Sequence, residues 1–237
     1  MPEGRREVDV AGAMARATAA LVTVDDTAGL LVGLLDECCA VMSAEAAGVL
    51  ALIPDGSVEV LSASSHKANE LEMYQSQTHS GPCLDTINFN SAVSAPSAEQ
   101  AQQRWPLFAE AMVTAGFGSA HSYPLRWHDM LIGGLNIFRS TEGALTEEQD
   151  RLGQTFADFA AIAIVCSGHV DMPQVVAQTR RALRAREIIE QAKGYLAFER
   201  DLDMAAAYDY LKKAAAESGR TLSDEAQHTL GRQTRRT

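Results

Sequence analysis

The first part of the chain has the apolar spacing of amphipathic helices. Residues 7–22 are rich in alanine, and in residues 27–42 leucines recur three to four positions apart. This spacing places apolar side chains on one face of a helix, and Asp25-Asp26-Thr27 provides capping residues before the second run. The pattern therefore predicts two opening helices.

The middle of the chain has the shorter apolar runs of β-strands. Residues 46–52 and 58–64 flank Pro54-Asp55-Gly56, which has turn chemistry, and residues 119–126 and 130–139 form a second such pair. Each pair predicts a hairpin of two antiparallel strands.

Helical patterns surround these strands. We expect helices over residues 66–77 and 105–115, and Thr146 with Gln149 fits a capping box at the start of a long helix. Because helices flank paired strands without regular alternation of strand and helix, the predicted fold class is α+β, with an antiparallel sheet and flanking helices.

The chain from residue 150 to about 200 has the pattern of one or two long helices. Its later part carries an apolar stripe, Ala182, Ala185, Ile189, Ala192 and Leu196, which should meet two further helices through Met204, Ala207, Leu211, Ala214, Leu222, Ala226 and Leu230. The linker between the domains has an apolar stripe of its own: Leu152, Phe156, Phe159, Ile162, Ala163 and Cys166, resumed by Val176, Leu183 and Ile189. A stripe on a helix that leaves a domain must be covered, by its own domain or by a second copy. We predict a homodimer.

Composition limits the class of protein. The chain has 237 residues, a net charge of −11 and 46% hydrophobic content, which suits one medium domain and a small one. It contains no run of about 18 apolar residues, and its amino terminus lacks the apolar core of a secretion signal. We therefore expect a cytoplasmic protein with no membrane partner.

The four cysteines are too few and too irregularly spaced for a disulfide framework, which predicts reduced thiols at Cys38, Cys39, Cys83 and Cys166.

The charge is divided unevenly along the chain. Residues 179–237 contain 12 Lys and Arg against 9 Asp and Glu, a net charge of +3, whereas residues 1–178 carry −14. A basic helical segment can attract a phosphate backbone, although helix faces are often basic only because they are solvated. Charge alone leaves both interpretations open.

Motifs of common enzyme classes are absent from the sequence. It has no Cys-x-x-Cys or His-Glu-x-x-His pair, no Gly-x-Ser-x-Gly nucleophile elbow and no P-loop. A binding protein is favoured over an enzyme, and no catalytic or metal site is predicted.

A series of short motifs between residues 79 and 166 resembles the GAF domain family. In chain order they are Ser80-Gly81-Pro82-Cys83-Leu84, Arg104-Trp105-Pro106-Leu107-Phe108, Ala115-Gly116-Phe117-Gly118-Ser119, Tyr123-Pro124-Leu125, Ile132-Gly133-Gly134-Leu135-Asn136-Ile137, and the segment from Leu145-Thr146 through Ala160. The resemblance covers roughly residues 15–168 and implies a central antiparallel sheet with a pocket that binds a small molecule in many relatives. For this pocket we expect Cys83, His121 and Tyr123.

The GAF resemblance names no single ligand, because relatives bind cyclic nucleotides, haem, bilins or no known ligand. The pattern of the cyclic-nucleotide class does not fit this chain, haem would need an axial histidine, and a covalent bilin would need a reactive Cys83. Some relatives reduce methionine sulfoxide with two thiols. A reductase that uses Cys83 with Cys38 or Cys39 is therefore a less favoured alternative function. Buried apolar thiols are the simpler interpretation.

The basic tail carries a second resemblance, which covers about residues 174–235. The run Arg-Glu-Ile-Ile-Glu-Gln-Ala-Lys-Gly at residues 186–194, Ala207-Tyr208 with Leu211, and Thr221-Leu222-Ser223-Asp224-Glu225-Ala226 are similar to the ANTAR family of three-helix antiterminators. ANTAR relatives bind RNA that carries paired stem-loops with six-nucleotide loops. Stabilising these hairpins prevents formation of an overlapping transcription terminator.

The ANTAR resemblance and helical geometry together suggest seven RNA contacts: Arg186, Gln191, Lys193, Gly194, Lys212, Lys213 and Arg220. Arg186 and Lys193 lie off the apolar stripe and can reach phosphate, and Gln191 can hydrogen-bond an unstacked loop base. Lys212, Lys213 and Arg220 either extend the basic face that contacts RNA or are ordinary solvated charges. Gly194 costs about 1 kcal/mol inside a helix relative to alanine, so we expect another backbone to approach it closely. Aromatic residues at helical spacing are more often core, so only one of four need face RNA: Tyr195, Phe198, Tyr208 or Tyr210.

These features divide the chain into a flexible amino terminus (1–14), a GAF sensor domain (15–168) and an ANTAR RNA-binding domain (169–236), with residues 150–180 as a helical linker. They predict a sheet domain joined by a long helix to an all-α three-helix bundle. The expected function is an RNA-binding transcription antitermination regulator controlled by a GAF sensor, with RNA stem-loops, a small molecule and a second copy as partners. The alternative is a small-molecule sensor whose helical tail binds protein or DNA.

Overall fold

A five-stranded antiparallel sheet forms the centre of the first domain. The computed structural model describes residues 9–23, 26–165 and 172–233. The strand order is β2-β1-β5-β4-β3, with β1 (Ala46–Leu52), β2 (Val58–Ala63), β3 (Val93–Ala95), β4 (Ser119–Trp127) and β5 (Met130–Arg139). Both predicted hairpins are present, as β1–β2 and β4–β5, and pairing of β1 with β5 joins them.

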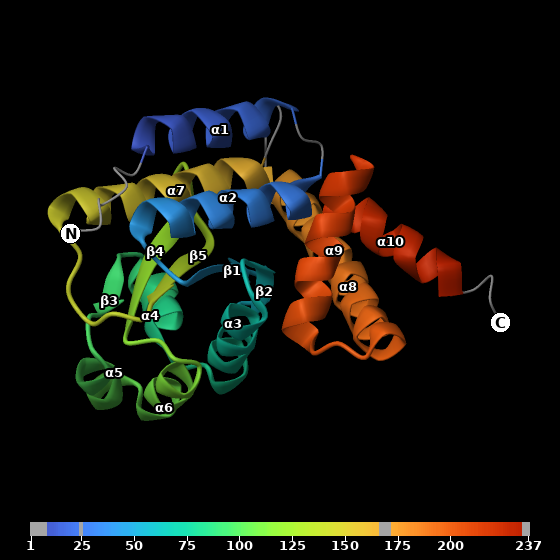
Figure 1. Cartoon of the computed structure of the whole chain (residues 1–237). Helices are drawn as coiled ribbons and strands as arrows, with labels where there is room; N and C mark the ends of the chain where they lie inside the picture. Colours follow the sequence, from blue (N-terminus) through green and yellow to red (C-terminus); the bar gives the residue numbers. More distant parts are fainter. Residues whose placement is uncertain (1–8, 24–25, 166–171, 234–237) are drawn as a thin grey trace, which may run out of the picture.

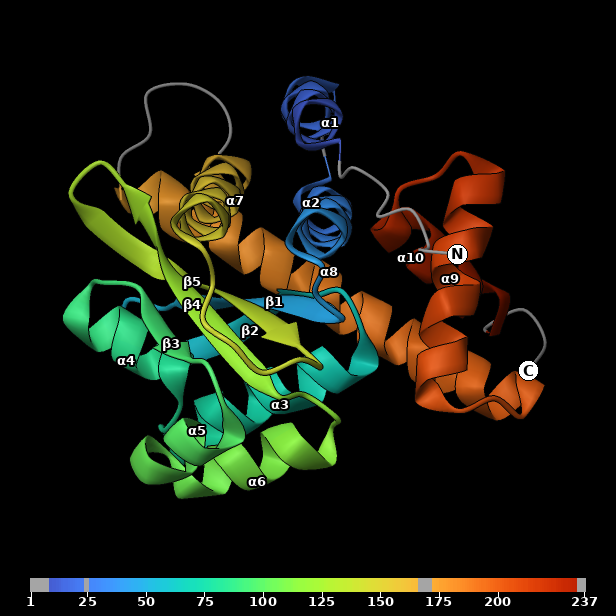
Figure 2. The same ribbon diagram turned by 60° about the vertical axis from the view of Figure 1, so that its left-hand side comes forward.

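Helices cover both faces of this sheet (Figures 1 and 2). One face carries α1 (Val10–Thr23), α2 (Thr27–Met42) and α7 (Glu147–Val165). The other face carries α3 (His66–Thr78), α4 (Pro82–Phe89), α5 (Ala98–Arg104) and α6 (Pro106–Thr114). The structure confirms the α+β class with an antiparallel sheet and flanking helices.

Side-chain caps fix the starts of the helices that the sequence pattern predicts. The Gln149 N–H donates to Thr146 Oγ1 at 3.2 Å and the Thr146 N–H donates to Gln149 Oε1 at 3.0 Å, which confirms the capping box before α7. Asp26 caps α2, because its carboxylate accepts from the Gly29 N–H at 3.1 Å.

Three helices follow the sheet domain, α8 (Met172–Arg200), α9 (Met204–Ser218) and α10 (Leu222–Gln233). The buried apolar residues that hold this bundle together are Ile189, Ala192, Leu196, Ala207, Tyr208, Leu211, Ala215, Leu222 and Ala226. Most of the predicted stripe is therefore confirmed. Three positions differ: Ala182 packs in the core of the sheet domain, Met204 does not belong to the cluster, and Ala215, not Ala214, is the buried alanine near the end of α9.

The bundle packs against the sheet domain. Ala28, which is 3% exposed, and Val32 project from α2 into the apolar cluster that holds the bundle. In the first half of α8, Val175 and Ala182 are buried in the core shared with α2 and α7. Helix α8 thus runs along the sheet domain before it enters the bundle (Figure 2).

Two expected boundaries differ from the structure. Ala13 is 1% exposed within α1, so residues 10–14 are folded and do not belong to a flexible amino terminus. Helix α7 ends at Val165 and α8 begins at Met172, so the expected linker contains parts of two helices, and Cys166 lies outside the described residues. Of the helices within the described residues, none is long and apolar enough to cross a membrane.

Candidate sensor and nucleic-acid sites

The three residues expected to line one sensor pocket lie on opposite faces of the sheet. Tyr123 projects from β4 toward α7, where its hydroxyl donates to Asp150 Oδ1 at 2.9 Å. His121 lies two residues earlier and so on the same face, whereas Cys83 lies on α4, which covers the other face. The expected shared pocket is wrong, because alternation along β4 turns its two members away from α4.

A buried polar cluster occupies the α3–α4 side of the sheet. We call it the Glu72 cluster; its members are Glu72, Gln75, Cys83, Ser122 and Asn136. The Glu72 carboxylate accepts hydrogen bonds from Asn136 Nδ2, at 2.7 and 2.8 Å, and from Gln75 Nε2, at 3.0 Å. Burial raises the pKa of Glu72 to about 8, against the opposing effect of these hydrogen bonds. The carboxyl group is therefore largely protonated at neutral pH.

Strand glycines make room for this cluster. A Cβ atom on Gly48 of β1 would lie 2.5 Å from Glu72 Oε1, and one on Gly134 of β5 would lie 2.6 Å from Cys83 Sγ. Real Cβ atoms do not approach other atoms so closely, so larger residues at these two positions would displace the cluster. Gly134 is the second residue of the Gly133-Gly134 pair in β5. A glycine pair in a strand indicates close packing, but the sequence alone does not show which side chain packs there.

Two buried polar atoms of the Glu72 cluster lack well-formed hydrogen bonds. Within the described part of the chain, neither Asn136 Oδ1 nor Ser122 Oγ makes a hydrogen bond of good geometry, and the Cys83 thiol is the neighbouring group that interacts with both side chains. Most buried polar groups are paired, so such atoms mark a place where a bound molecule can supply the missing bond. The Glu72 cluster is the candidate sensor site on this face; all five of its members are buried, so a ligand would have to separate them to bind.

The structure does not bring the candidate redox thiols together. Cys38 lies in the apolar core between the sheet and α2, whereas Cys83 lies across the sheet beneath α4. Burial raises the pKa of both thiols well above the ordinary value, which opposes thiolate formation. Cys39 donates to Ser64 Oγ at 3.7 Å, and burial raises its pKa to about 11. The two-thiol arrangement expected of a reductase is absent among these three cysteines.

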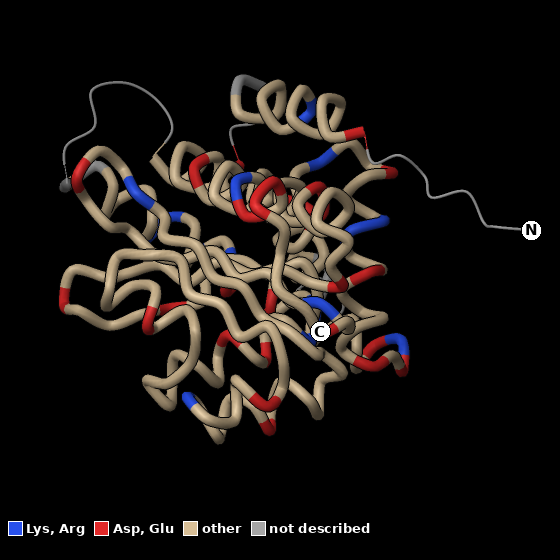
Figure 3. The backbone as a smooth tube through the Cα atoms, turned by 90° about the vertical axis from the view of Figure 1, so that its left-hand side faces the viewer, with Lys and Arg blue, Asp and Glu red and all other residues tan. Residues whose placement is uncertain are grey.

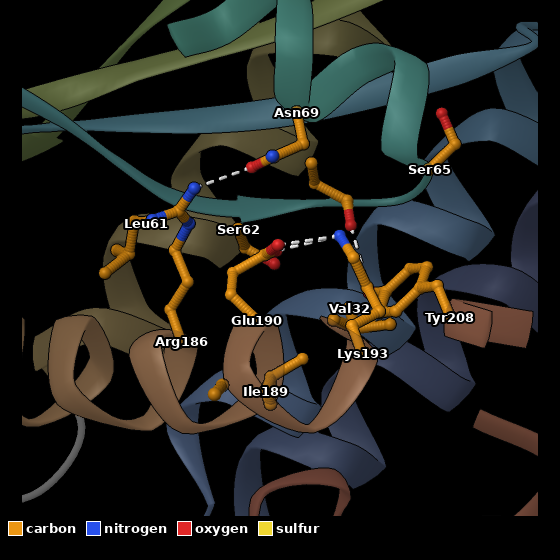
Figure 4. Close-up of a pocket in the computed structure, with 12 residues that line it drawn as sticks. Val32, Leu61, Ser62, Ser65, Asn69, Arg186, Ile189, Glu190, Lys193 and Tyr208 are labelled. Carbon is orange, nitrogen blue, oxygen red and sulfur yellow. Dashed lines mark hydrogen bonds and ion pairs between the residues drawn. The ribbon is translucent and has the colours of Figure 1, made fainter. Parts of the chain in front are cut away.

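In the bundle, Lys193 lies buried against the sheet domain (Figure 4). Its side chain is 2% exposed, with Nζ 2.8 Å from Glu190 Oε2 and 5.3 Å from the centroid of the Tyr208 ring. The Tyr208 hydroxyl donates to the Ala63 carbonyl of β2 at 3.2 Å, so the ring is held between the two domains. Lys193 is expected to reach phosphate, but in this arrangement it cannot, because the sheet domain covers that side of α8.

Two further residues expected to contact RNA also face the sheet domain. Arg186 Nη2 donates to Asn69 Oδ1 of α3 at 2.8 Å, and Lys212 Nζ lies 3.7 Å from Asp36 Oδ2 of α2. Around Lys193 the domains leave a cavity of about 30 Å³, on the scale of one water molecule. A more open groove of about 640 Å³ separates α2 from the end of α9 and the start of α10. The interface is therefore closely packed around Lys193 and more open beside Lys212.

The remaining expected contacts, Gln191, Gly194, Lys213 and Arg220, are exposed. Arg220 Nη1 lies 2.7 Å from Glu225 Oε2, which holds the guanidinium beside α10. The surface expected to bind RNA is thus divided into a part that the sheet domain covers and a part that stays open.

The charges of the two domains complement each other. Asp and Glu residues are spread over the face of the sheet domain that is turned to the viewer in Figure 3, in keeping with the −14 charge of residues 1–178. Helix α8 carries six Lys and Arg against three Glu, so the acidic domain can attract this helix and compete with a polyanion for its cations.

Comparison with known proteins agrees with both domains. The GAF family model matches residues 22–164 and the ANTAR family model matches residues 177–229. Among solved structures, the fold is similar to the GAF domain of phosphoenolpyruvate-protein phosphotransferase from Acinetobacter, with a TM-score of 0.52 and 12% identity over 68% of this chain and 97% of that chain. The corresponding domain from Coxiella burnetii has a TM-score of 0.51 and 15% identity over 65% and 91% of the two chains. No curated protein matches the chain.

The two matched ranges correspond to the two folded parts. Residues 22–164 contain α2, the whole sheet and nearly all of α7, and residues 177–229 contain most of the three-helix bundle. The chain belongs to the GAF family and is a GAF-ANTAR protein, in which an ANTAR domain follows the GAF domain.

Proposed function

We propose that the chain is an RNA-binding transcription antitermination regulator, whose ANTAR domain binds paired stem-loops in nascent RNA under the control of the GAF domain. The ANTAR match and the basic charge of the bundle support RNA binding. The observation that carries the regulatory part is the burial of Lys193 beneath the GAF domain, together with the contacts of Arg186 with Asn69 and of Lys212 with Asp36. Covered cations cannot reach phosphate, so we assign this arrangement to a state of low RNA affinity.

Helix α3 connects the proposed sensor site to the bundle. Asn69 of α3 holds Arg186, and Glu72 and Gln75, one and two turns later, belong to the Glu72 cluster. A small polar ligand that donates a hydrogen bond to Asn136 Oδ1 would rearrange this cluster and shift α3. We propose that such a shift breaks the contact between Asn69 and Arg186 and releases the bundle. Native mass spectrometry of the freshly purified chain can identify a retained ligand.

Competition between nucleic acids tests the proposed function. The full chain bound to a labelled RNA with two stem-loops should be displaced by the same unlabelled RNA, and at least tenfold less well by duplex DNA of equal length. The physical reason is that stem-loops present unstacked bases, whereas a duplex does not. Equal displacement by DNA would contradict the proposal and favour a tail that binds DNA.

We propose a homodimer as the form that binds two stem-loops, because two hairpins require two bundles. The start of the α8 stripe gives this no support, since Val175 and Ala182 are buried within the chain itself. Light scattering at micromolar concentration with the two-hairpin RNA should give the mass of two chains per RNA. One chain per RNA would contradict the dimer.

A further inference from the structure

Helix α8 has an exposed face that lies outside the core of the bundle and meets the GAF domain only at Arg180, which borders a groove beside the β1–β2 hairpin. We call it the outer face of α8; it consists of Arg180, Arg184, Glu187, Gln191, Gly194 and Phe198. The spacings alternate between four and three residues, which places all six on one side of the helix. From Arg184 to Phe198 this face extends about 21 Å, at a rise of about 1.5 Å per residue.

Gly194 has no packing role in the described part of the chain. A Cβ atom built on it would meet no described atom within 4 Å, so alanine fits without a clash. Glycine destabilises a helix interior relative to alanine, and no contact within the described chain offsets this loss of stability. The close backbone approach that the sequence predicts is therefore not met within the described chain, and this side of Gly194 is open to another molecule.

Phe198 lies one turn further along the same face and is 91% exposed. Two of the other three aromatic candidates have surroundings that limit stacking. Tyr208 is 6% exposed, and the Arg200 guanidinium lies 4.1 Å from the centroid of the Tyr210 ring. The Phe198 ring offers both of its faces to a partner.

Resting on the proposed function, we propose that the outer face of α8 reads the RNA loop, with an unpaired base stacked on Phe198 and the RNA backbone lying against Gly194. Arg180 and Arg184 then lie where they can contact phosphates of the adjoining stem, and Gln191 lies between them and the loop. Bases stack on aromatic rings whatever their sequence, and a loop presents them unpaired.

The charges favour RNA over a second copy of the chain as the occupant. Arg180, Arg181 and Arg184 are all exposed near one end of this face, with Glu187 as its acidic member. A parallel pairing of two such faces would bring the arginines of both copies together, whereas a phosphate backbone neutralises them.

Replacing Phe198 tests the stacking contact. Phe198→Ala should weaken binding of the two-hairpin RNA about fivefold or more, because base stacking on an aromatic ring contributes at least that much, whereas Phe198→Trp should retain affinity. Phe89→Ala is the matched control, since Phe89 is 66% exposed on α4 of the GAF domain. Fluorescence of 2-aminopurine placed in the loops should be quenched by the wild type and not by Phe198→Ala.

The outcomes separate this proposal from the proposed function. If the wild type binds the RNA and Phe198→Ala binds it equally well, the stacking contact alone is overturned. A Phe198→Ala variant that changes the oligomeric state while leaving RNA affinity unchanged would assign this face to a second copy and also overturn it. Failure of the wild type to bind any two-hairpin RNA would instead count against the proposed function.

Gly194→Ala gives an independent test with opposite effects on stability and binding. Removing a helical glycine without a clash should raise the melting temperature, while the added methyl group should weaken RNA binding several-fold. Gly33→Ala is the matched control, because Gly33 of α2 is exposed and its Cβ would also meet no described atom within 4 Å. Unchanged RNA affinity of Gly194→Ala would overturn the proposed approach of the RNA backbone.

Discussion

Ala28→Phe should raise the affinity of the full chain for a two-hairpin RNA about tenfold. Ala28 is 3% exposed and projects from α2 into the apolar cluster of the bundle. A phenylalanine cannot fit there without separating the domains, and overpacking of this kind costs about 1–3 kcal/mol. That cost falls on the docked state alone, so the population shifts toward the released state, in which Arg186 and Lys193 can reach phosphate. Fluorescence anisotropy of labelled RNA measures the change.

Two further variants assign this gain to the covered cations. Ala40→Phe places the same ring on an exposed position of α2, and we expect wild-type affinity. Lys193→Gln added to Ala28→Phe should remove most of the gain and reduce the slope of affinity against salt by about 1, as expected for one lost phosphate contact. Affinity of Ala28→Phe equal to that of the wild type would show that docking does not limit RNA binding.

Glu72→Gln should change how stability depends on pH. The pKa of Glu72 is about 8 in the folded chain, compared with an ordinary value of 4.5, so between these values the folded state holds a proton that the unfolded state releases. The stabilising effect is complete below pH 4.5 and is lost as the pH rises to about 8. Relative to Glu72→Gln, the wild type should lose about 3 kcal/mol of unfolding free energy between pH 5.5 and 8.5.

Urea unfolding of both proteins at the two pH values measures this difference. Glu59→Gln removes an exposed carboxylate from β2 and serves as the control, which should keep the wild-type change with pH. If Glu72→Gln keeps it as well, Glu72 does not hold its proton in the folded chain. Glu72→Gln also keeps the Glu72 cluster neutral at high pH. Comparison of this variant with the wild type at about pH 8.5 therefore tests whether ionisation of Glu72 perturbs α3.

Sequence periodicity was sufficient for most of the elements, because helices and hairpins depend on local spacing and turn chemistry. It did not predict α5, which is only seven residues long. Its one local signal is Ser97, whose hydroxyl accepts from the Gln100 N–H at 3.2 Å. The resemblance to both families, which rests on the order of short motifs, was confirmed. Motif order can be read from the sequence because it does not depend on how the domains pack.

The sites were harder to predict, because they depend on contacts between distant segments. Alternation along β4 places His121 and Tyr123 on one face, but only the packing of α4 shows that Cys83 lies on the other. Lys193 lies off the stripe that holds the bundle together, and a pattern within α8 carries no information about a second domain that covers it. The burial of Ala28 by the bundle is hidden from the sequence for the same reason.

The coverage of Lys193 is tested most directly by its reactivity. In the free wild-type chain, mass spectrometry after brief treatment with an acetylating reagent should find Lys193, with a side chain 2% exposed, modified much more slowly than Lys213, with a side chain 75% exposed. In Ala28→Phe, the modification of Lys193 should approach the rate of Lys213, while Ala40→Phe keeps the wild-type ratio. Equal rates for the two lysines in the free wild-type chain would contradict the account, because the GAF domain would then leave this face of the ANTAR domain open.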